Sequence, residues 1–221
     1  MNKFYDSIEA LLPLRGGSKG IVRKNLKIFN NFPLFYWTAK AIIESKVKLN
    51  ISSEDLEIKK SAKNFFPNIN IIDRPAVIAQ DSSSTEEVIQ HFLDSNDCEH
   101  VLLIQATSPL VKSCEINKAL QNYYDNNCRP LVSGTLQRRF IWDEKGYPKN
   151  YDPFNRPRRQ EWEGDFVENG ALYIFSRKDF LKNHSRCNPP CTLFIMDEVH
   201  HYEIDSELDW MILENIMKNS F

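Results

Sequence analysis

Short apolar runs alternate with segments of helical periodicity along this chain, and the alternation limits the folds that it can adopt. The runs expected to form strands cover residues 8–14, 69–73, 101–106, 171–175 and 200–205, with a weaker run beginning at Leu49. Helices are expected from Leu34 to about Ser45, after the weak strand up to Phe65, from a capping box at Ser84, from a cap at Ser113, and from Ser206 to about Met217. Such alternation predicts βαβ units and therefore an α/β fold, with a mostly parallel sheet and helices on both faces.

Residues 138–162 break this rhythm. They are rich in Arg, Pro, Asn and aromatic residues, and they are too long for a simple connection. A chain of 221 residues with 42% apolar content can bury the core of one ordinary domain. We therefore expect a single domain over residues 1–221, with an inserted segment at about residues 136–168 that is used for binding or for pairing.

Charge and composition exclude several classes of protein. The formal net charge of −2 argues against a surface built to bind nucleic acid. No apolar run approaches the ~18 residues that cross a bilayer, and residues 1–10 carry acids where a signal peptide needs an apolar stretch. The cysteines are odd in number and scattered, as reduced thiols are, and two prolines interrupt the Cys187 to Cys191 spacing that a zinc site would need. We expect a cytosolic protein without a membrane or nucleic-acid partner.

A glycine loop follows the first predicted strand, in the stretch LLPLRGGSKGIVRKN. Gly16 and Gly17 let backbone amides approach a ligand closely. The loop carries five cations, namely Arg15, Lys19, Arg23, Lys24 and Lys27. Such a concentration of positive charge suits a triphosphate, which carries a charge of roughly −4. The spacing is neither that of a Walker loop nor that of a dinucleotide loop. A surface turn with solvated lysines is the alternative.

Five blocks, taken in order, resemble the acylneuraminate cytidylyltransferases, also called CMP-sialic acid synthetases. They are LLPLRGGSKGIVRKN, DRPAVIAQDSSST, IQATSPL, NRPRRQEWEGDFVENGALYI and EIDSELDW, and the resemblance runs from about residue 8 to residue 216. It implies a Rossmann-like nucleotidyltransferase fold and a homodimer. It also implies the reaction of CTP with an acidic nine-carbon sugar, which gives the CMP-sugar and pyrophosphate.

The resemblance gives roles to the loop and to the block after the third strand. A nucleotidyl transfer leaves negative charge on the departing pyrophosphate, and the resemblance implies that Arg15, Lys19 and Lys24 meet that charge. The nucleotide-binding residues that it implies are Leu14, Gly16, Gly17, Ser18, Asn25, Arg74, Ala79 and Ser83. A surface arginine at position 74 and a helix cap over residues 82–85 are the alternatives.

The resemblance implies sugar contacts by Gln105, Arg158, Arg159, Gln160, Glu168 and Asn169. Gln105 lies where the strongest strand should end, from which its amide can reach a hydroxyl. Arginines such as Arg156 and Arg158 can hold a carboxylate in a fork, and the resemblance places them in a dimerisation segment that reaches the partner's active site. A strand-capping glutamine, a solvated arginine loop and a plain Asn-Gly turn are the alternatives. Val111 stands where the family has an arginine, so any contact of that arginine is absent or supplied elsewhere.

Two carboxylates near the end of the chain are expected to bind Mg²⁺. Glu203 and Asp205 alternate along a predicted strand and would share one face, and hard oxygen ligands suit this ion. The family has aspartate at both positions, so direct coordination is expected from Asp205, while Glu203 could reach the metal through water. We assign Asp209 to the cap of the last helix, in the pattern Ser206-x-x-Asp209.

Two rival functions remain open. A cytidylyltransferase for an eight-carbon ulosonic acid would share the glycine loop but hardly needs the RPRRQEW block. A catalytically silent nucleotide-binding homologue would account for Val111 and Glu203. Every version that binds both nucleotide and metal requires Lys19 and Asp205 to face a common cleft.

Overall fold

The computed structural model describes residues 7–219. Residues 1–6, which form part of the stretch used above to argue against a signal peptide, lie outside the described residues. Within residues 7–219, no helix combines the length and the apolarity that a bilayer crossing requires.

Seven strands form the central sheet, in the order β5-β4-β1-β6-β8-β7-β9. Their bounds are β1 Ile8–Pro13, β4 Lys48–Ser53, β5 Asn70–Asp73, β6 His100–Ile104, β7 Leu131–Gln137, β8 Asp165–Ser176 and β9 Thr192–Ile195. Strands β5, β4, β1 and β6 pair in parallel, β8 runs antiparallel to β6 and β7, and β7 runs parallel to β9. The mostly parallel sheet expected from the alternation is confirmed.

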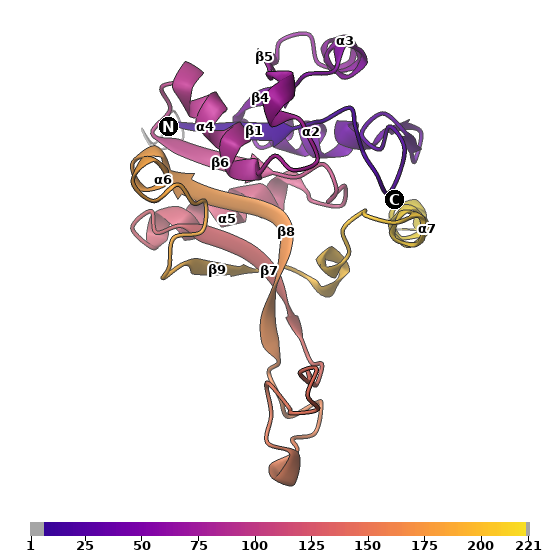
Figure 1. The fold of residues 1–221 in the computed structure, drawn as a ribbon, viewed down its shortest axis with the longest axis vertical. Helices are drawn as coiled ribbons and strands as arrows, with labels where there is room; N and C mark the ends of the chain where they lie inside the picture. Colours follow the sequence, from indigo (N-terminus) through magenta and orange to yellow (C-terminus); the bar gives the residue numbers. More distant parts are fainter. Residues whose placement is uncertain (1–6, 220–221) are drawn as a thin grey trace.

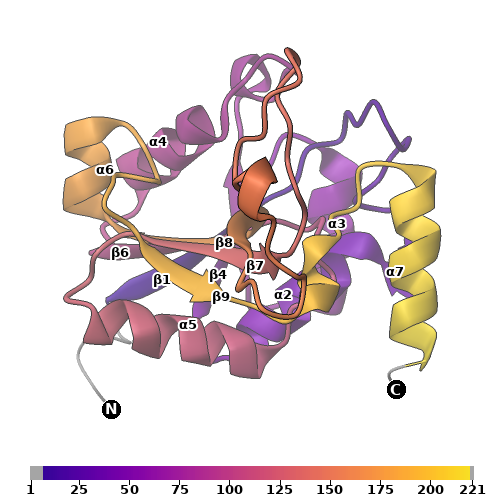
Figure 2. The ribbon, with the colours of Figure 1, turned by 90° about the horizontal axis from the view of Figure 1, so that it is seen from below.

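Helices cover both faces of this sheet (Figures 1 and 2). Successive residues of β1 enter two different cores, because Ala10 and Leu12 pack into one cluster and Leu11 packs into the other. The first cluster receives buried residues of α2 (Leu34–Glu44), α3 (Leu56–Phe65) and α5 (Ser113–Asp125). The second receives those of α4 (Thr85–Ser95) and α6 (Arg177–Asn183). Strands buried on both faces explain why their sequences read as continuous apolar runs.

Helix starts follow the sequence signals, with one shift. The capping box predicted at Ser84 is present, since Ser84 Oγ accepts from the Glu87 amide and the Glu87 carboxylate accepts from the Ser84 amide. The cap predicted at Ser113 is displaced by one residue. Ser113 is the first residue of α5, and the Glu115 carboxylate accepts a hydrogen bond from the Lys112 amide at 2.9 Å.

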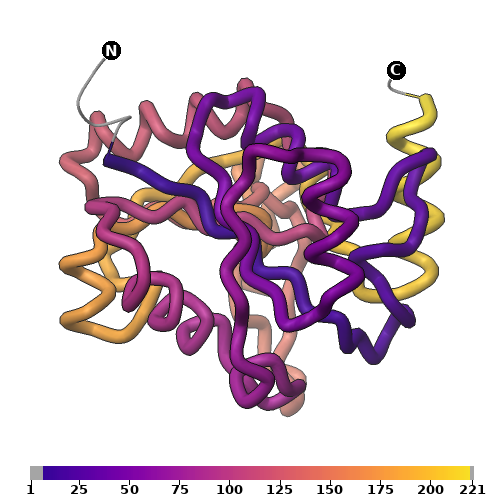
Figure 3. Tube along the Cα trace, turned by 90° about the horizontal axis from the view of Figure 1, so that it is seen from above, coloured from indigo at the N-terminus to yellow at the C-terminus, as the bar shows by residue number. Residues whose placement is uncertain are grey.

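A third cluster fixes the last helix, α7 (Glu207–Asn219), beside the loop that follows β1 (Figures 1 and 3). A short hairpin, β2 (Ile28–Phe29) with β3 (Phe32–Pro33), ends that loop. Phe29 meets the Trp210 ring edge to face, with the centroids 5.2 Å apart, and Ile204 is fully buried in the same cluster. Burial of a tryptophan of this kind contributes on the order of 3 kcal/mol to stability. The cluster therefore holds the segment before α7 against the glycine loop.

Residues 138–164, here called the arm, leave the sheet between β7 and β8 and project away from the body of the molecule (Figure 1). The two strands continue as an antiparallel ladder from Gly134 to Gln137, after a register shift between Val132 and Gly134. Inside the arm, Phe140 and Trp162 stack with their ring centroids 5.1 Å apart. The arm also holds a short 3-10 helix, η2 (Pro153–Asn155).

The strand predicted over residues 200–205 is wrong. Glu198–His201 forms a short 3-10 helix, η3, and an irregular segment leads from there to α7. Strand β9 occupies the sheet edge beside β7 instead, and it was missed. His200 turns into the interior, where its Nε2 lies 2.8 Å from the Glu115 carboxylate. One more short 3-10 helix, η1 (Ala76–Ile78), lies between β5 and α4.

Candidate active site

A cleft with a volume of about 380 Å³ opens beyond the carboxyl ends of β1 and β6, as expected for a parallel sheet. Residues from both halves of the chain line it. The predicted site residues that it brings together are Arg15, Ser18, Lys19, Lys24, Asn25, Arg74, Ala79, Ser83, Gln105 and Asp205. Lys19 and Asp205 thus face a common cleft, which is the requirement stated above.

Lys24 joins the glycine loop to the acidic segment before α7. Its Nζ donates to the Ile204 carbonyl at 2.6 Å and to Asp205 Oδ1 at 3.1 Å. Gly20 makes the approach possible, because a Cβ at that position would stand 2.4 Å from the Asp205 carbonyl oxygen. The cationic loop and the acidic segment are therefore held in direct contact.

Asp81 bridges the two cations at the mouth of the cleft. Arg15 Nη1 lies 2.7 Å from Asp81 Oδ1, and Lys19 Nζ lies 3.0 Å from Asp81 Oδ2. The hydrogen bond from Lys19, followed by that from Arg15, holds the pKa of the Asp81 carboxyl below its usual value. One carboxylate thus balances the pair of cations assigned above to an anionic ligand.

Neither Gly16 nor Gly17 lines this cleft. The Gly16 amide donates to Glu54 Oε1 at 2.6 Å, and a Cβ at Gly16 would meet Asp55 Oδ2 at 2.4 Å. Gly17 is exposed, and the Leu14 side chain is fully buried. The Gly16 contact corrects the expectation that its amide faces the ligand, while the same expectation for the Gly17 amide stays a prediction. Ser18, Lys19 and Gly20 are the loop residues that line the cleft.

Two buried polar side chains shape the wall of the cleft. The Arg74 guanidinium donates to the Ser52 carbonyl and, at 3.2 Å, to Ser52 Oγ, so it belongs to the wall and is no exposed surface arginine. Burial lowers its pKa from the ordinary arginine value, and the neighbouring Arg15 charge acts in the same direction. Asn25 Nδ2 donates to the Arg15 carbonyl at 2.9 Å, which fixes the start of the loop.

A second cleft, with a volume of about 440 Å³, adjoins the first through Gln105, Thr107 and Asp205. We call it the acceptor cleft. Its remaining lining residues are Glu168, Gly170, Tyr173, Arg186 and Glu203. The Tyr173 hydroxyl donates to Glu168 Oε1 at 2.5 Å. Gln105 lines both clefts and so stands at their junction, and its backbone N–H donates to the Ala171 carbonyl at 3.1 Å just past the end of β6.

Glu203 and Asp205 flank the buried Ile204 without a strand to carry them. The Ile204 amide donates to the Thr107 carbonyl at 2.9 Å, and both carboxylates line the acceptor cleft, so they share one side as predicted. Asp209 caps α7 as expected, accepting from the Ser206 amide at 2.8 Å. Burial, reinforced by the Asp205 charge, raises the pKa of the Glu203 carboxyl from 4.5 to about 7.

Replacement of Glu203 by glutamine is expected to stabilise the metal-free protein at neutral pH. Below pH 4.5 the Glu203 carboxyl is protonated in both the folded and the unfolded protein, so it does not lower the free energy of unfolding. Between pH 4.5 and about 7 the carboxyl ionises in the unfolded chain but not in the folded protein, so the folded protein loses stability as the pH rises. The gain for Glu203→Gln at pH 8 is on the order of 1 kcal/mol, reduced from the full linkage value by the partial exposure of the group. Urea unfolding in EDTA from pH 4 to pH 8 measures it, and an equal difference between the two proteins at every pH would contradict it.

Several predicted residues lie outside both clefts of their own chain. Asn169 is buried, and its Oδ1 accepts from Ser133 Oγ at 2.7 Å while its Nδ2 donates to the His200 carbonyl at 2.9 Å. Asn169 therefore links β8 to β7 and η3, and it lines neither cleft. Arg158, Arg159 and Gln160 are exposed on the arm. Val111 is buried in the first core cluster, which explains how this chain accommodates a valine there.

Polar residues of the site that the sequence reasoning missed include Asp81, Thr107, Tyr173 and Arg186. Tyr173 lies inside an apolar strand, and Arg186 stands in an irregular loop with no periodicity. Asp81 and Thr107 lie inside blocks that were singled out for other residues. Their only signal is that Thr107 comes soon after the end of β6 and Asp81 soon after η1, close to the carboxyl edge of the sheet.

Comparisons with known proteins agree with this geometry. A family model described as cytidylyltransferase matches residues 10–207. An N-acylneuraminate cytidylyltransferase from Oncorhynchus mykiss is 33% identical over 217 residues, which cover 94% of this chain and 49% of that protein. The chain thus spans about half the length of such relatives. The post-translational flagellin modification protein B of Campylobacter coli is 30% identical over 217 residues, with 92% of both chains covered.

Solved structures show the same fold at low sequence identity. A CMP:2-keto-3-deoxy-manno-octonic acid synthetase complexed with CTP superposes with a TM-score of 0.71 at 13% identity, over 97% of this chain and 100% of that one. A 4-diphosphocytidyl-2C-methyl-D-erythritol synthase from Anaerococcus prevotii gives 0.68 at 12% identity, over 96% and 98%. The fold, the cleft and the family model lead to one assignment: the chain belongs to the cytidylyltransferase family.

Proposed function

We propose that this chain transfers CMP from CTP to the anomeric hydroxyl of a nonulosonic, sialic-type acid and releases pyrophosphate. The observation that carries the proposal is the single cleft in which Arg15, Lys19 and Lys24 meet Asp205. The relatives named N-acylneuraminate cytidylyltransferase support the choice of acceptor. In this reaction the anomeric oxygen forms a bond to the α-phosphorus of CTP, the bond from that phosphorus to the oxygen bridging the β-phosphorus breaks, and the hydroxyl proton is released.

The nucleotide occupies the first cleft in this proposal. Arg15 and Lys19 exchange Asp81 for the β- and γ-phosphates, where cations stabilise the charge that accumulates on the leaving pyrophosphate. Lys24, held by Ile204 and Asp205, stands between the phosphates and the acceptor cleft. Ser18, Asn25, Arg74, Ala79 and Ser83 line the remainder of the nucleotide cleft.

The acceptor sugar occupies the second cleft. Gln105 and Glu168, both expected to contact sugar, line it and can bond hydroxyl groups. The shared residues Gln105, Thr107 and Asp205 place the two substrates next to each other. Such proximity is what an in-line transfer between two bound substrates needs.

Mg²⁺ is part of the proposal. Asp205 presents a largely exposed carboxylate to both clefts, and one or two carboxylates completed by phosphate oxygens form the donor set that Mg²⁺ prefers. Among residues 7–219 no three His, Cys, Asp or Glu side chains gather as a metal cage, which suits an ion held jointly with the triphosphate. Asp205 would hold it, with Glu203 in support. Bound there, the ion would neutralise charge on the phosphates.

The arm supplies the sugar carboxylate contacts from a second subunit in this proposal. Arg158, Arg159 and Gln160 are exposed on the arm, which projects away from the body of its own chain (Figure 1). The aromatic stack of Phe140 with Trp162, and Arg156 at 4.2 Å over the Phe140 ring, give the arm a defined surface for pairing. A homodimer would bring each arm to the clefts of its partner. The five free cysteines fit a cytoplasmic location, which is also where CTP is available.

Mixed dimers test the exchange of arms. The Asp205→Ala variant has a disabled cleft but an intact arm. The Arg158→Ala/Arg159→Ala variant has an intact cleft but a disabled arm. Unfolding and refolding of an equal mixture is expected to restore about a quarter of the unmodified activity, because half of the dimers then contain one intact site. No restoration, with dimers present by sedimentation, would show that the arm acts on its own chain.

Removal of the Asp81 carboxylate is expected to tighten CTP binding. Asp81→Asn frees Arg15 and Lys19, and affinity should rise by about three- to tenfold, the range for releasing two exposed ion pairs. Titration calorimetry with CTP measures it. The matched control is Asp73→Asn, which breaks the Lys59 ion pair at 2.5 Å outside the cleft and should leave affinity unchanged. Weaker binding by Asp81→Asn would mean that Asp81 itself contacts the ligand.

Pyrophosphate release with CTP and Mg²⁺ tests the function directly. The acceptor panel contains N-acetylneuraminate, its deaminated analogue, a legionaminic-type acid and an eight-carbon ulosonic acid. We expect release with at least one nine-carbon acid and none with the eight-carbon acid. Preference for the eight-carbon acid would favour the rival synthetase. CTP binding without release on any acceptor would identify a silent homologue.

A further inference from the structure

A buried pair of side chains lies just before the segment that carries Asp205. His200, in η3, places its Nε2 2.8 Å from Oε1 of Glu115 on α5, and the two side chains are 6% and 15% exposed. The proposed function gives neither residue a role, and neither lines the two clefts. Because removal of one partner would leave the other uncompensated inside the protein, such a pair joins its two segments firmly.

Glu115 uses both of its carboxylate oxygens. Oε1 faces His200, and Oε2 accepts a hydrogen bond from the Lys112 amide at 2.9 Å. Burial acts to raise the pKa of the Glu115 carboxyl, but the hydrogen bonds from His200 and from the Lys112 amide hold that pKa below its usual value. The carboxylate therefore only accepts, and His200 is the donor. Glu115 thus fixes the end of the loop that runs from β6 to α5, and it binds η3 to that loop.

The same loop holds the acidic residues before α7 at a second place. Near the start of the loop, the Thr107 carbonyl accepts from the Ile204 amide at 2.9 Å. The stretch from His200 to Asp205 is therefore joined to this loop at both ends. Contacts at Ile204 and Asp205 alone would hold only the far end of the stretch, whereas the His200 bond fixes its near end and thus its direction. The residues that both clefts share lie within or beside this frame, namely Gln105, Thr107 and Asp205.

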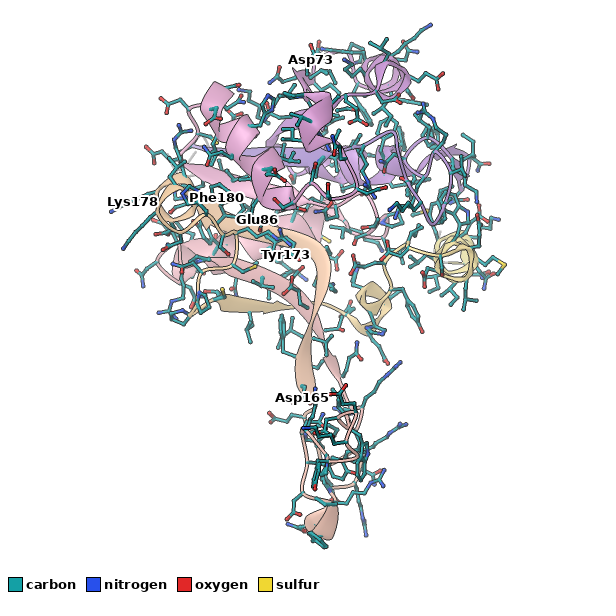
Figure 4. All side chains as sticks on the ribbon, in the orientation of Figure 1. Asp73, Glu86, Asp165, Tyr173, Lys178 and Phe180 are labelled. Carbon is teal, nitrogen blue, oxygen red and sulfur yellow. The ribbon has the colours of Figure 1, made fainter. Side chains whose placement is uncertain are left out.

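The backbone of His200 is fixed from the sheet. Its carbonyl accepts from Asn169 Nδ2 at 2.9 Å, while Asn169 Oδ1 accepts from Ser133 Oγ at 2.7 Å. Asn169 lies on β8 between Asp165, beside the arm, and Tyr173, within the body of the molecule (Figure 4). A change of the His200 side chain leaves this backbone bond in place, so it can test the pair without releasing the whole turn.

We propose that His200 and Glu115 are positioning residues for the transfer reaction, and that their bond fixes the direction in which Asp205 presents its carboxylate to the nucleotide cleft. This inference rests on the proposed function, because it concerns the carboxylate proposed to hold Mg²⁺ together with the triphosphate. Loss of the pair should weaken the Mg²⁺-dependent part of CTP binding and slow the transfer. Binding of the nucleotide to Arg15 and Lys19 should be spared, because these cations belong to the opposite wall of the cleft lining.

His200→Ala is expected to lower kcat for pyrophosphate release by about 10- to 100-fold, the range for residues that orient the ligands of a metal. Calorimetry should show CTP binding in Mg²⁺ weakened by about three- to tenfold, whereas binding in EDTA stays within about twofold. His200→Gln should keep turnover within about threefold of the unmodified chain, because the glutamine Nε2 can donate where the imidazole Nε2 does.

His100→Ala is the matched control. His100 also bonds α5, since its Nδ1 lies 3.0 Å from the Tyr123 hydroxyl, but it begins β6, at the end of that strand away from the clefts. Both changes should lower Tm, His200→Ala by roughly 5–15 °C, as expected for a buried pair that loses one partner. His100→Ala should nonetheless keep kcat and the Mg²⁺-dependent binding of CTP within about threefold.

A second variant carries the test if His200→Ala does not fold. Glu115→Gln has one accepting oxygen for two donors, so it should lower kcat in the same direction, by about three- to tenfold. Unchanged kcat in both variants, or an equal loss in His100→Ala, would overturn the positioning role and leave the proposed function intact. If the unmodified chain released no pyrophosphate with any acceptor of the panel, the proposed function would fail, and this inference with it.

Discussion

Asp205→Ala is expected to lower pyrophosphate release by at least about a thousandfold, because it removes the main carboxylate proposed to hold Mg²⁺ at the transferring phosphate. The Asp205 side chain is 76% exposed, and its ion pair is with Lys24 alone among the described residues. The carboxylate is therefore available to a ligand from both clefts. Removing it should abolish the dependence of CTP binding on Mg²⁺, while binding measured in EDTA stays within about twofold.

Glu207→Gln is the matched control for Asp205. Glu207 is the next acid along the chain but lines neither cleft, and it pairs with Lys27 at 2.7 Å. Its loss should leave turnover within about threefold, as expected for an exposed ion pair. If Asp205→Ala kept more than about a tenth of the activity, the metal would have to be held by other groups, and the proposed role of Asp205 would be abandoned.

Lys19→Ala is expected to lower kcat by about 100- to 1000-fold, the cost of removing one preorganised donor from a developing anion. The Lys19 side chain is 79% exposed and pairs only with Asp81 among the described residues, so its charge is free to follow the ligand. Because the charge on the leaving pyrophosphate grows in the transition state, the loss should fall on kcat more than on the KM for CTP. Stopped-time pyrophosphate assays at saturating CTP measure the difference.

Lys27→Ala provides the matched control for Lys19. Lys27 belongs to the same cationic loop, yet it bonds Glu207 and lies 4.5 Å over the Trp210 ring, outside the cleft. We expect a modest loss of thermal stability and turnover within about threefold. A Lys19→Ala variant with unchanged kcat and a raised KM for CTP would show that Lys19 contributes only to binding in the ground state.

The local signals in the sequence were sufficient for the parallel half of the fold. Strands β1 and β6 are continuous apolar runs, since both of their faces are buried, and the α4 start follows from one capping box. The antiparallel half of the sheet was harder to predict from the sequence. Strand β7 carries Ser133, Gly134 and Thr135, which are buried by neighbouring strands without being apolar, and the seven residues of α6 are too few to show a period.

The sequence predicted the site residues that belong to clusters of charge. It did not predict those whose role depends on the direction in which a backbone or amide group points. Lys19, Lys24 and Asp205 were found because cations and acids stand out in the sequence, and the cleft brings them together. Gly16 was misplaced because a glycine indicates close approach but not to which neighbour, and here the neighbours are Glu54 and Asp55. Asn169 was misplaced for a similar reason, since a buried amide can bond backbone as readily as ligand. Nothing in the sequence marks Arg186 as a site residue, because its place depends on contacts with Glu86 and Tyr173 that only the fold creates.

The packing of Phe29 and Ile21 against Trp210 and Ile204 has a consequence for how the enzyme is made. On the ribosome, the loop that carries Lys19 emerges well before helix α7, so its apolar side chains at first have no helix to cover them. Asp205, the acid that completes the cleft, is synthesised only shortly before Trp210. A nascent chain released before Trp210 could form much of the sheet, yet it would expose Phe29 and offer a cationic loop without its acidic counterpart.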